Sequence, residues 1–417
     1  MRIKQIKALE ILSSAGRPTV QATVITDTGI EGVASVPIGT SKGKYEAKML
    51  YDGGKRYGGF GVRKAVANIE QHIAPRLIGK EVVRQREIDE LLIEMDGTED
   101  KSKLGCNAIL AVSLAVARAG ARSSSLPLYR YLGGPEANRL PVPAATVIAG
   151  GEYSPSPLDF EDYILVFHGF TTFSEALESL VNTYFCLGKL LHEKYEIVPN
   201  IPGGAYAPLT RDTEEAFEFM LKAIEKAGYS GKISLGLDVA GSDLYDEKNG
   251  CYKIKGQEMT ADELAEYYIN LIKSYPVVYL EDPFHQDDFE SFARLTSALP
   301  KIQIVGDDLF VTNPARIKQG IEKKACNAIL LKINQIGTLS EACDAASLAK
   351  RHNYDITVSM RSSDTNDSFI ADFALAIGAR QMKAGSPVSG ERNAKYNRLL
   401  EIEQELGSEA KFPGIFS

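Results

Sequence analysis

Residues 277–332 read VVYLEDPFHQDDFESFARLTSALPKIQIVGDDLFVTNPARIKQGIEKKACNAILLK. Three short apolar runs in this stretch, 277–281, 302–306 and 328–332, have the length and composition of buried strands. The segments between them have helical apolar spacing, and a helix is predicted over 314–323. Strands that are buried on both faces and separated by helices are typical of a parallel β/α sheet.

The same alternation continues on both sides of this stretch. Further strands are predicted at 143–148, 163–167, 233–239, 355–359 and 381–384, and further helices at 214–227, 260–274, 339–351 and 369–378. So many β/α units favour a closed barrel over an open, doubly wound sheet. The chain has no GxGxxG motif after a strand and no GxxxxGK[ST] motif, so nucleotide-binding folds lose support.

The N-terminal part of the chain has a different pattern. Strands are predicted at 3–11, 19–26 and 32–37, and helices at 62–78, 81–95 and 106–123. Turn formers between Gly133 and Pro143 indicate a linker. We therefore expect an α/β protein with an N-terminal α+β capping domain at 1–130 and a C-terminal β/α barrel domain at 140–417 that carries the functional site.

Composition excludes several classes of function. Of the 417 residues, 44% are hydrophobic and 24% are charged, which excludes a globally disordered chain. The net charge of -8 argues against a nucleic-acid partner. The five cysteines form no CxxC pair, which indicates buried thiols in a reducing compartment. No apolar run approaches the ~18 residues of a membrane span and no signal peptide is evident, so we expect a cytoplasmic protein without a membrane partner.

Polar side chains follow five of the predicted strands, at the point where each strand ends. They are Asp238, Glu281, Asp307, Lys332 and Lys383. In a closed parallel barrel these ends meet at one mouth, so the side chains would converge there. Three carboxylates around one point need a cation, and their hard oxygen atoms suit Mg²⁺ or Mn²⁺. A lysine beside such an ion can have a lowered pKa and act as a base, so we expect proton abstraction next to a carboxylate.

Long segments of the chain resemble the enolase family, whose reaction converts 2-phosphoglycerate to phosphoenolpyruvate. The matching segments include DGTEDKSKLGCNAILAVSLAVARAG (96–120), GLDVAGSDLY (236–245), EDPFHQDD (281–288), IQIVGDDLFVTNP (302–314), ACNAILLKINQIGTLSEA (325–342) and AKYNRLLEIEQELG (394–407). The resemblance runs nearly end to end. It implies an N-terminal α+β cap on a modified TIM-type barrel, and a homodimer or an octamer built from dimers.

The resemblance also implies roles for the metal site. Asp238, Glu281 and Asp307 match the ligands of a first Mg²⁺, and Ser41 matches the cap residue that reaches a second Mg²⁺ when substrate is bound. Mg²⁺ is therefore the expected cofactor, and stabilisation of an enolate by Mg²⁺ is the known pattern of this superfamily.

Further matches concern the substrate, which the resemblance implies to be a small phosphorylated carboxylic acid. Lys332 matches the base that takes the α-proton, and Lys383 matches the residue that stabilises the enolate. Arg361 and Ser362 match the pair that binds the substrate phosphate, in agreement with the bidentate chemistry of arginine.

The family residues that assist loss of the hydroxyl group are replaced in this chain. One family glutamate matches Gly203, and no carboxylate occurs from 197 to 211. The other matches Asp162, which is one methylene shorter, and its neighbouring glutamine matches Glu161. Two family histidines, at positions that the resemblance places near the substrate, are also replaced. They match Tyr153 and Met360.

These replacements define the functional prediction. Losing general-acid assistance costs a factor of roughly 10²–10⁴ in rate, so loss of hydroxide would need a substitute acid. We expect an enolase-like, Mg²⁺-dependent carbon–oxygen lyase that acts through a metal-stabilised enolate on a phosphorylated or phosphonate acid, with an altered substrate or leaving group. One alternative is a phosphopyruvate hydratase in which Asp162, Glu161 or Tyr153 serves as the acid. The other is a non-catalytic binding protein with the same fold.

Overall fold

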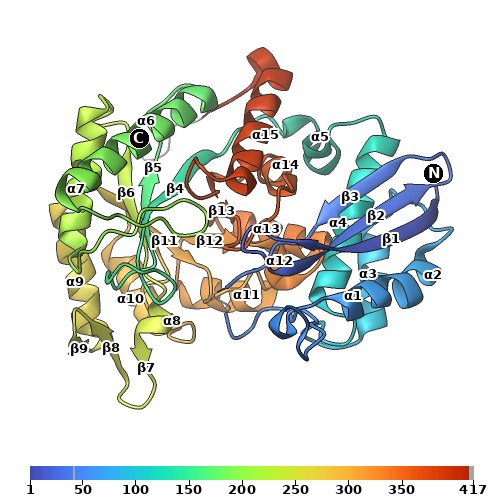
Figure 1. Ribbon diagram of the computed structural model, residues 1–417, viewed down its shortest axis with the longest axis horizontal. Helices are drawn as coiled ribbons and strands as arrows, with labels where there is room; N and C mark the ends of the chain where they lie inside the picture. Colours follow the sequence, from blue (N-terminus) through green and yellow to red (C-terminus); the bar gives the residue numbers. More distant parts are fainter. Residues whose placement is uncertain (41–42, 413–417) are drawn as a thin grey trace.

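A closed eight-stranded barrel forms the C-terminal part of the computed structural model, which describes residues 1–40 and 43–412 (Figure 1). Its strands are β4 (Val142–Ala149), β5 (Asp162–Val166), β6 (Ser234–Asp238), β10 (Val277–Glu281), β11 (Gln303–Gly306), β12 (Ala328–Leu331), β13 (Asp355–Ser359) and β14 (Gln381–Lys383), and β14 pairs with β4 to close the ring. The predicted barrel is confirmed, because each predicted apolar run of the C-terminal part forms one of these strands.

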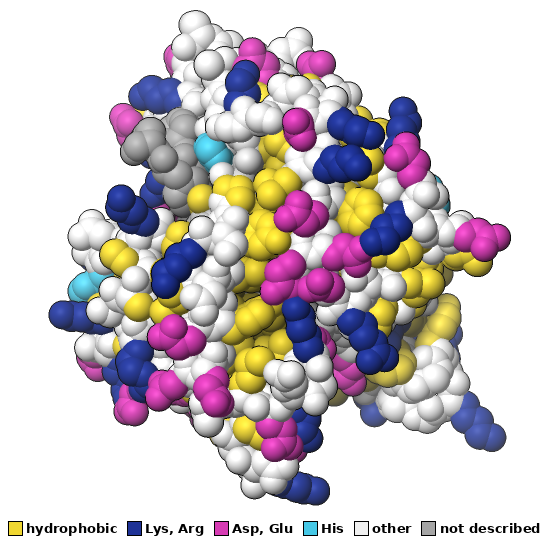
Figure 2. Space-filling view, turned by 90° about the vertical axis from the view of Figure 1, so that its left-hand side faces the viewer, with side chains coloured by type: hydrophobic (Ala, Val, Ile, Leu, Met, Phe, Trp, Pro, Cys, Tyr) yellow, Lys and Arg dark blue, Asp and Glu magenta, His cyan; other side chains and the backbone are white. Residues whose placement is uncertain are grey.

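Helices cover the outside of the barrel. They are α6 (Phe173–Lys194), α7 (Thr213–Lys226), α9 (Ala261–Ser274), α10 (Phe289–Ala298), α11 (Pro314–Lys323), α13 (Leu339–Arg351), α14 (Phe369–Ala376) and α15 (Gly390–Leu406). Local sequence sets several of their first residues: Thr260 and Glu263 form a capping box at the start of α9. Figure 2 views the barrel side of the molecule, where acidic and basic side chains both occur across the surface. None of the helices in the described residues is long and apolar enough to cross a membrane.

Two short helices and a small sheet complete the barrel part. Helix α8 (Gly241–Leu244) follows β6, and α12 (Ile333–Ile336) follows β12. The sheet consists of β7 (Tyr245–Asp246), β8 (Cys251–Ile254) and β9 (Gln257–Met259), and it projects from the barrel beside α9 (Figure 1).

Strand β5 departs from the predicted parallel arrangement. It pairs antiparallel with both β4 and β6, whereas the other neighbouring barrel strands are parallel. The cause is the connection between β4 and β5, residues 150–161, which contains no crossover helix. The inversion brings the first residue of β5, Asp162, opposite Asp238, the last residue of β6.

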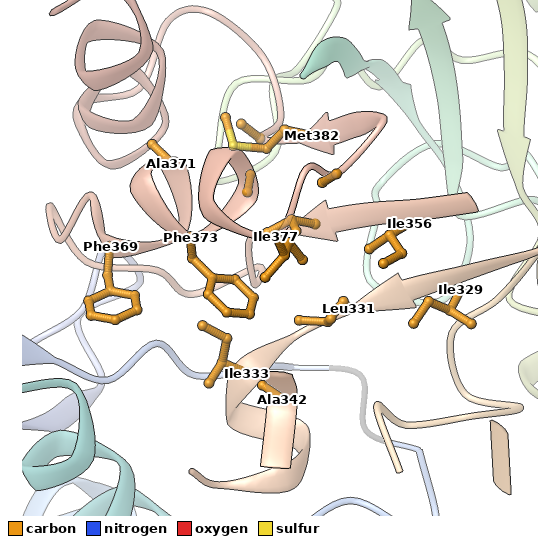
Figure 3. Close-up of a cluster of buried hydrophobic side chains, with 14 of the residues drawn as sticks. Ile329, Leu331, Ile333, Ala342, Ile356, Phe369, Ala371, Phe373, Ile377 and Met382 are labelled. Carbon is orange, nitrogen blue, oxygen red and sulfur yellow. The ribbon is translucent and has the colours of Figure 1, made fainter. Parts of the chain in front are cut away.

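The strands that carry the two lysines are fixed by the core between the barrel and its helices. Leu331 and Met382, the residues that precede Lys332 and Lys383, are 0% and 1% exposed. Figure 3 shows the side chain of Leu331 close to Phe373 of α14 and to Ile377, the residue that follows this helix. Full burial of a side chain of this size contributes about 1.5–3 kcal/mol, so this packing holds the ends of β12 and β14 in place.

The N-terminal part is a three-stranded antiparallel sheet with helices. The strands are β1 (Ile3–Leu12), β2 (Pro18–Thr26) and β3 (Glu31–Ser35), and the helices are α1 (Arg63–Asn68), α2 (Ala74–Leu77), α3 (Gln85–Asp96), α4 (Cys106–Ser123) and α5 (Leu128–Gly133). A π-helical turn at Ile69–Ile73 interrupts the helix predicted over 62–78. Gly32 permits close packing of β3 on α4, because a Cβ atom there would lie 2.1 Å from the carbonyl oxygen of Ala115.

Partly buried ion pairs join the N-terminal part to the barrel. Lys101 Nζ lies 2.9 Å from Glu341 of α13. The two Nη atoms of Arg118 donate to Asp367 at 2.7 Å each. These contacts place the N-terminal part over the carboxyl ends of the barrel strands, where the predicted site residues lie.

Candidate active site at the barrel mouth

A cavity of about 240 Å³ opens at the carboxyl ends of the barrel strands. The predicted site residues Tyr153, Glu161, Asp162, Asp238, Asp307, Lys332, Arg361, Ser362 and Lys383 all line it. Glu281 lies at the end of β10 and is fully buried. Ser41 lies outside the described residues. The structure therefore brings together, in one place, side chains that are more than 200 positions apart in the sequence.

Lys383 is the centre of the acidic cluster. Its Nζ atom lies 2.6 Å from Asp238, 3.0 Å from Glu281 and 3.0 Å from Asp162. Burial by itself lowers the pKa of Lys383, but the carboxylates of Asp238 and Glu281 outweigh it and raise the pKa. The ammonium group is therefore charged and can stabilise negative charge beside it.

Lys332 forms a direct ion pair with Asp307, and both side chains line the same cavity. Burial again lowers the pKa of Lys332, but Asp307 raises it by more, so the pKa is above its ordinary value. From the sequence, we expected the pKa of this lysine to be lowered by a neighbouring divalent cation. The pKa is raised instead because the Asp307 carboxylate, with no cation beside it, favours the ammonium form of Lys332. A cation bound to Asp307 would oppose this effect.

The donor set at the strand ends fits a hard divalent cation. Asp238, Glu281 and Asp307 supply only carboxylate oxygen atoms, the ligand type that Mg²⁺ prefers. Glu281 Oε2 accepts a hydrogen bond from the Tyr279 hydroxyl at 2.5 Å, whereas the buried Oε1 has no hydrogen-bond partner among the described residues. Burial and the nearby Asp238 raise the pKa of Glu281 well above its ordinary value. A cation would give the unpaired oxygen of Glu281 a partner and would reduce the repulsion between the carboxylates.

A second acidic group lies next to the first. Oxygen atoms of Asp282, Asp307 and Asp308 lie within 4.8 Å of one another. The Asp282 carboxylate accepts the backbone N–H groups of Asp307 at 2.9 Å and of Asp308 at 2.6 Å. Asp282 therefore fixes the loop after β11. Burial, followed by the charge of Asp307, raises the pKa of Asp308 to about 8.

The predicted phosphate-binding pair also lines the cavity and lies against the N-terminal part. The Arg361 guanidinium donates to both oxygens of Glu46 at 3.0 Å, and to Asn334 Oδ1 at 3.2 Å. Ser362 Oγ accepts the backbone N–H of Thr40 at 2.8 Å. Arginine and a serine hydroxyl therefore lie side by side where an anionic group can meet both.

The candidate acids lie on the β4–β5 connection and at the start of β5. Tyr153 is 51% exposed on this loop, and burial raises its pKa. Burial, with the charges of Asp238 and Asp162, raises the pKa of Glu161 well above its ordinary value. Asp162 is instead paired with the ammonium group of Lys383. Glu161 is thus a carboxyl group whose protonated form is favoured by its surroundings beside the acidic cluster.

The position of the missing glutamate also lines the cavity. Gly203 has φ +99°, and a Cβ atom there would lie 2.9 Å from Nη2 of Arg392. This backbone conformation favours glycine, so the loop would have to change shape to carry a glutamate side chain. Met360, which matches a family histidine, lines the cavity as well.

Several polar residues around the site were not predicted from the sequence, among them Glu46, Gln335 and Arg392. Gln335 Nε2 donates to Asp307 Oδ1 at 2.8 Å, and its place three residues after Lys332 was an available signal. Arg392 donates to the carbonyl oxygens of Arg361 and Ser362 at 2.6 and 2.9 Å. Glu46 gave no local signal, because its contact depends on how the N-terminal part packs on the barrel.

Comparison with known proteins agrees with this architecture. The family description "Enolase, N-terminal domain" matches residues 3–132, and "Enolase, C-terminal TIM barrel domain" matches residues 137–417. A protein named enolase from Methanopyrus kandleri is 54% identical over 416 residues, which cover 99% of this chain and 97% of that protein. A protein of the same name from Pyrococcus furiosus is 51% identical, and the match covers 98% of this chain and 96% of that protein. One from Methanothrix thermoacetophila is 49% identical, and the match covers 99% of this chain and 98% of that protein.

Proposed function

Because the chain belongs to the enolase family and is an enolase-family lyase, we propose that it dehydrates 2-phosphoglycerate to phosphoenolpyruvate. The observation that carries the proposal is the convergence of Lys332, Lys383 and three carboxylates in one cavity that Arg361 also lines. The names of the relatives support the hydratase reaction over the altered reaction that the replaced residues suggested.

We propose Asp238, Glu281 and Asp307 as the ligands of Mg²⁺. When bound, Mg²⁺ supplies a Lewis acid that favours negative charge on the oxygens of the substrate carboxylate. Arg361 and Ser362 bind the phosphate group and orient the substrate. In its neutral amine form, Lys332 Nζ accepts the proton from C2, and the electron pair of that bond moves toward the carboxylate. The Lys383 ammonium group stabilises this charge, because it is held in place before the charge develops.

We propose Glu161 as the acid that protonates the leaving hydroxyl. The electron pair from C2 then forms the C2–C3 double bond, the C3–O bond breaks, and the hydroxyl leaves as water with the proton of Glu161. Its position on the cavity wall and the direction of its pKa shift support this assignment. Asp162 is a weaker candidate because its carboxylate is already paired with the Lys383 ammonium group.

Two measurements on the same enzyme test the proposal. Formation of phosphoenolpyruvate from 2-phosphoglycerate with Mg²⁺ reports the whole reaction, and exchange of the C2 proton with deuterated solvent reports the first half alone. We expect both activities in the wild type and neither in Lys332→Ala. A wild type without C2 exchange would refute the roles given to Lys332 and the carboxylates.

The role of Glu161 has its own test. Glu161→Gln should lower phosphoenolpyruvate formation by a factor of about 10²–10⁴ and leave C2 exchange within a few-fold of the wild type. The exposed neighbour Glu152, substituted by Gln, is the matched control and should change neither activity. Equal loss of both activities in Glu161→Gln would contradict a role as the acid.

A second candidate function rests on Gly203. The stretch 197–211 contains no carboxylate, so the enolate could be formed on a related phosphorylated acid and then reprotonated, or could expel a better leaving group than hydroxide. A wild type that exchanges the C2 proton of 2-phosphoglycerate but forms no phosphoenolpyruvate would favour this function over the first. The family membership also supports a homodimer or octamer, which the mass of the purified protein in solution would test.

A further inference from the structure

Glu46 belongs to the N-terminal part but contacts Arg361, which lines the barrel cavity. Its two carboxylate oxygens each accept a hydrogen bond from Arg361, Oε2 from Nη1 and Oε1 from Nη2, both at 3.0 Å. The side chains of the pair are 8% and 3% exposed. A bidentate pair of this kind fixes the plane of the guanidinium group as well as its distance from the carboxylate.

Other neighbours prevent the Arg361 guanidinium from rotating. A Cβ atom at Gly39 would lie 1.8 Å from Nη2 and 2.4 Å from Cζ, so the backbone of the N-terminal part packs directly against the guanidinium. Asn334 Oδ1 accepts from Nη1 at 3.2 Å. The orientation of this arginine is therefore set by the N-terminal part together with Asn334 of α12.

Glu46 is also connected to the carboxylates of the acidic cluster. Gln335 Nε2 donates to Glu46 Oε1 at 3.3 Å and to Asp307 Oδ1 at 2.8 Å. The backbone N–H of Ala47 donates to the carbonyl oxygen of Gln335 at 2.8 Å, which fixes this segment on the barrel. One network thus joins Arg361, Glu46, Gln335 and Asp307.

We propose that Glu46 is a positioning residue that orients Arg361 for the phosphate group of the substrate. Arginine binds an anion best when its planar fork faces the anion in a fixed direction, so a guanidinium that can turn loses affinity for phosphate. Glu46 itself does not contact the reacting atoms; it acts through Arg361. This inference rests on the proposed function only in that the substrate carries a phosphate group.

The test compares Glu46→Gln with the wild type in steady-state kinetics and in calorimetric titrations with 2-phosphoglycerate and with inorganic phosphate, all with Mg²⁺. The amide keeps the shape but loses the second acceptor and the charge. We expect KM and both dissociation constants to rise about tenfold, with kcat changed less than threefold. Glu46→Asp keeps the charge one methylene further from Arg361 and should show a smaller rise.

Glu341→Gln is the matched control. It removes the charged partner of Lys101 in a partly buried pair between the two parts of the molecule, and neither residue lines the cavity. A rise in KM that is the same in Glu341→Gln and Glu46→Gln, or no rise in Glu46→Gln, overturns the proposal. If Glu46→Gln does not fold, Glu46→Asp decides in the same way. If the wild type neither binds nor converts 2-phosphoglycerate, the proposed function fails. The titration with inorganic phosphate still tests Glu46: weaker binding by Glu46→Gln than by the wild type supports its role, and unchanged binding overturns it.

Discussion

Replacement of Lys383 by methionine should reveal how strongly the acidic cluster depends on a positive charge. The ammonium group lies between 2.6 and 3.0 Å from Asp238, Glu281 and Asp162, and the lysine is 3% exposed. Methionine keeps most of the volume, so little packing is lost. What remains is a set of buried carboxylates without their nearest cation.

The magnitude follows from these contacts. Removing one partner of a buried ion pair destabilises a protein by about 3–5 kcal/mol, because the other charge is left uncompensated. We therefore expect the free energy of unfolding of Lys383→Met, in buffer with a chelator, to be lower than that of the wild type by about 3–5 kcal/mol. Mg²⁺ should shrink this difference, since the variant's carboxylates then regain a counter-charge.

The pH dependence has a definite sign. The pKa of Glu281 is raised above 4.5, so its contribution to stability is present below 4.5 and is lost as the pH rises through the folded-state value. Lys383 opposes this shift, and its removal raises the pKa of Glu281 further. Without Mg²⁺, the deficit of Lys383→Met should therefore grow as the pH rises above 4.5.

Urea unfolding, with and without Mg²⁺, is the assay. Lys318→Met, on the exposed face of α11, is the control and should change the free energy of unfolding by no more than about 1 kcal/mol. A Lys383→Met protein as stable as the wild type in the chelator would refute the reasoning about the buried charges. A deficit that Mg²⁺ leaves unchanged would refute the placement of the cation at this cluster.

Three further predictions concern other parts of the molecule. Tyr279→Phe removes the hydroxyl that donates to Glu281 and should weaken Mg²⁺ binding about 10–100-fold in a calorimetric titration; unchanged affinity would exclude Glu281 as a ligand oriented in this way. Burial raises the pKa of Asp89, which accepts hydrogen bonds from Ser340, so its contribution to stability is lost as the pH rises from 3.8 through the folded-state value. Asp89→Asn should remove this pH dependence of the free energy of unfolding, measured by unfolding curves at several pH values. The same pH dependence in the variant and the wild type would contradict the prediction. Leu331→Ala should lower the free energy of unfolding by about 2–5 kcal/mol, and a loss below 1 kcal/mol would contradict the packing in Figure 3.

The sequence alone determined the barrel and most of its mouth. A barrel surrounded by helices is one of the few arrangements in which apolar strands that alternate with helices are buried on both faces. A polar residue directly after such a strand then lies at the strand's open end. That reasoning placed Asp238, Glu281, Asp307 and Lys332 correctly at the ends of β6, β10, β11 and β12. It was local, because strand, strand end and side chain are adjacent in the chain.

Tertiary structure alone decided which partners these side chains meet. The inversion of β5 brings Asp162 beside Asp238 although it begins a strand, which no rule about strand ends could predict. The pairing of Glu46 with Arg361 joins positions 315 residues apart, and it exists only because the N-terminal part packs over the barrel. The raised pKa of Glu161 likewise comes first from burial and then from Asp238 on β6, with the adjacent Asp162 adding to it. Alternation of apolar and polar residues fixes where each side chain points, but the electrostatic surroundings of that side chain depend on distant segments that fold against it.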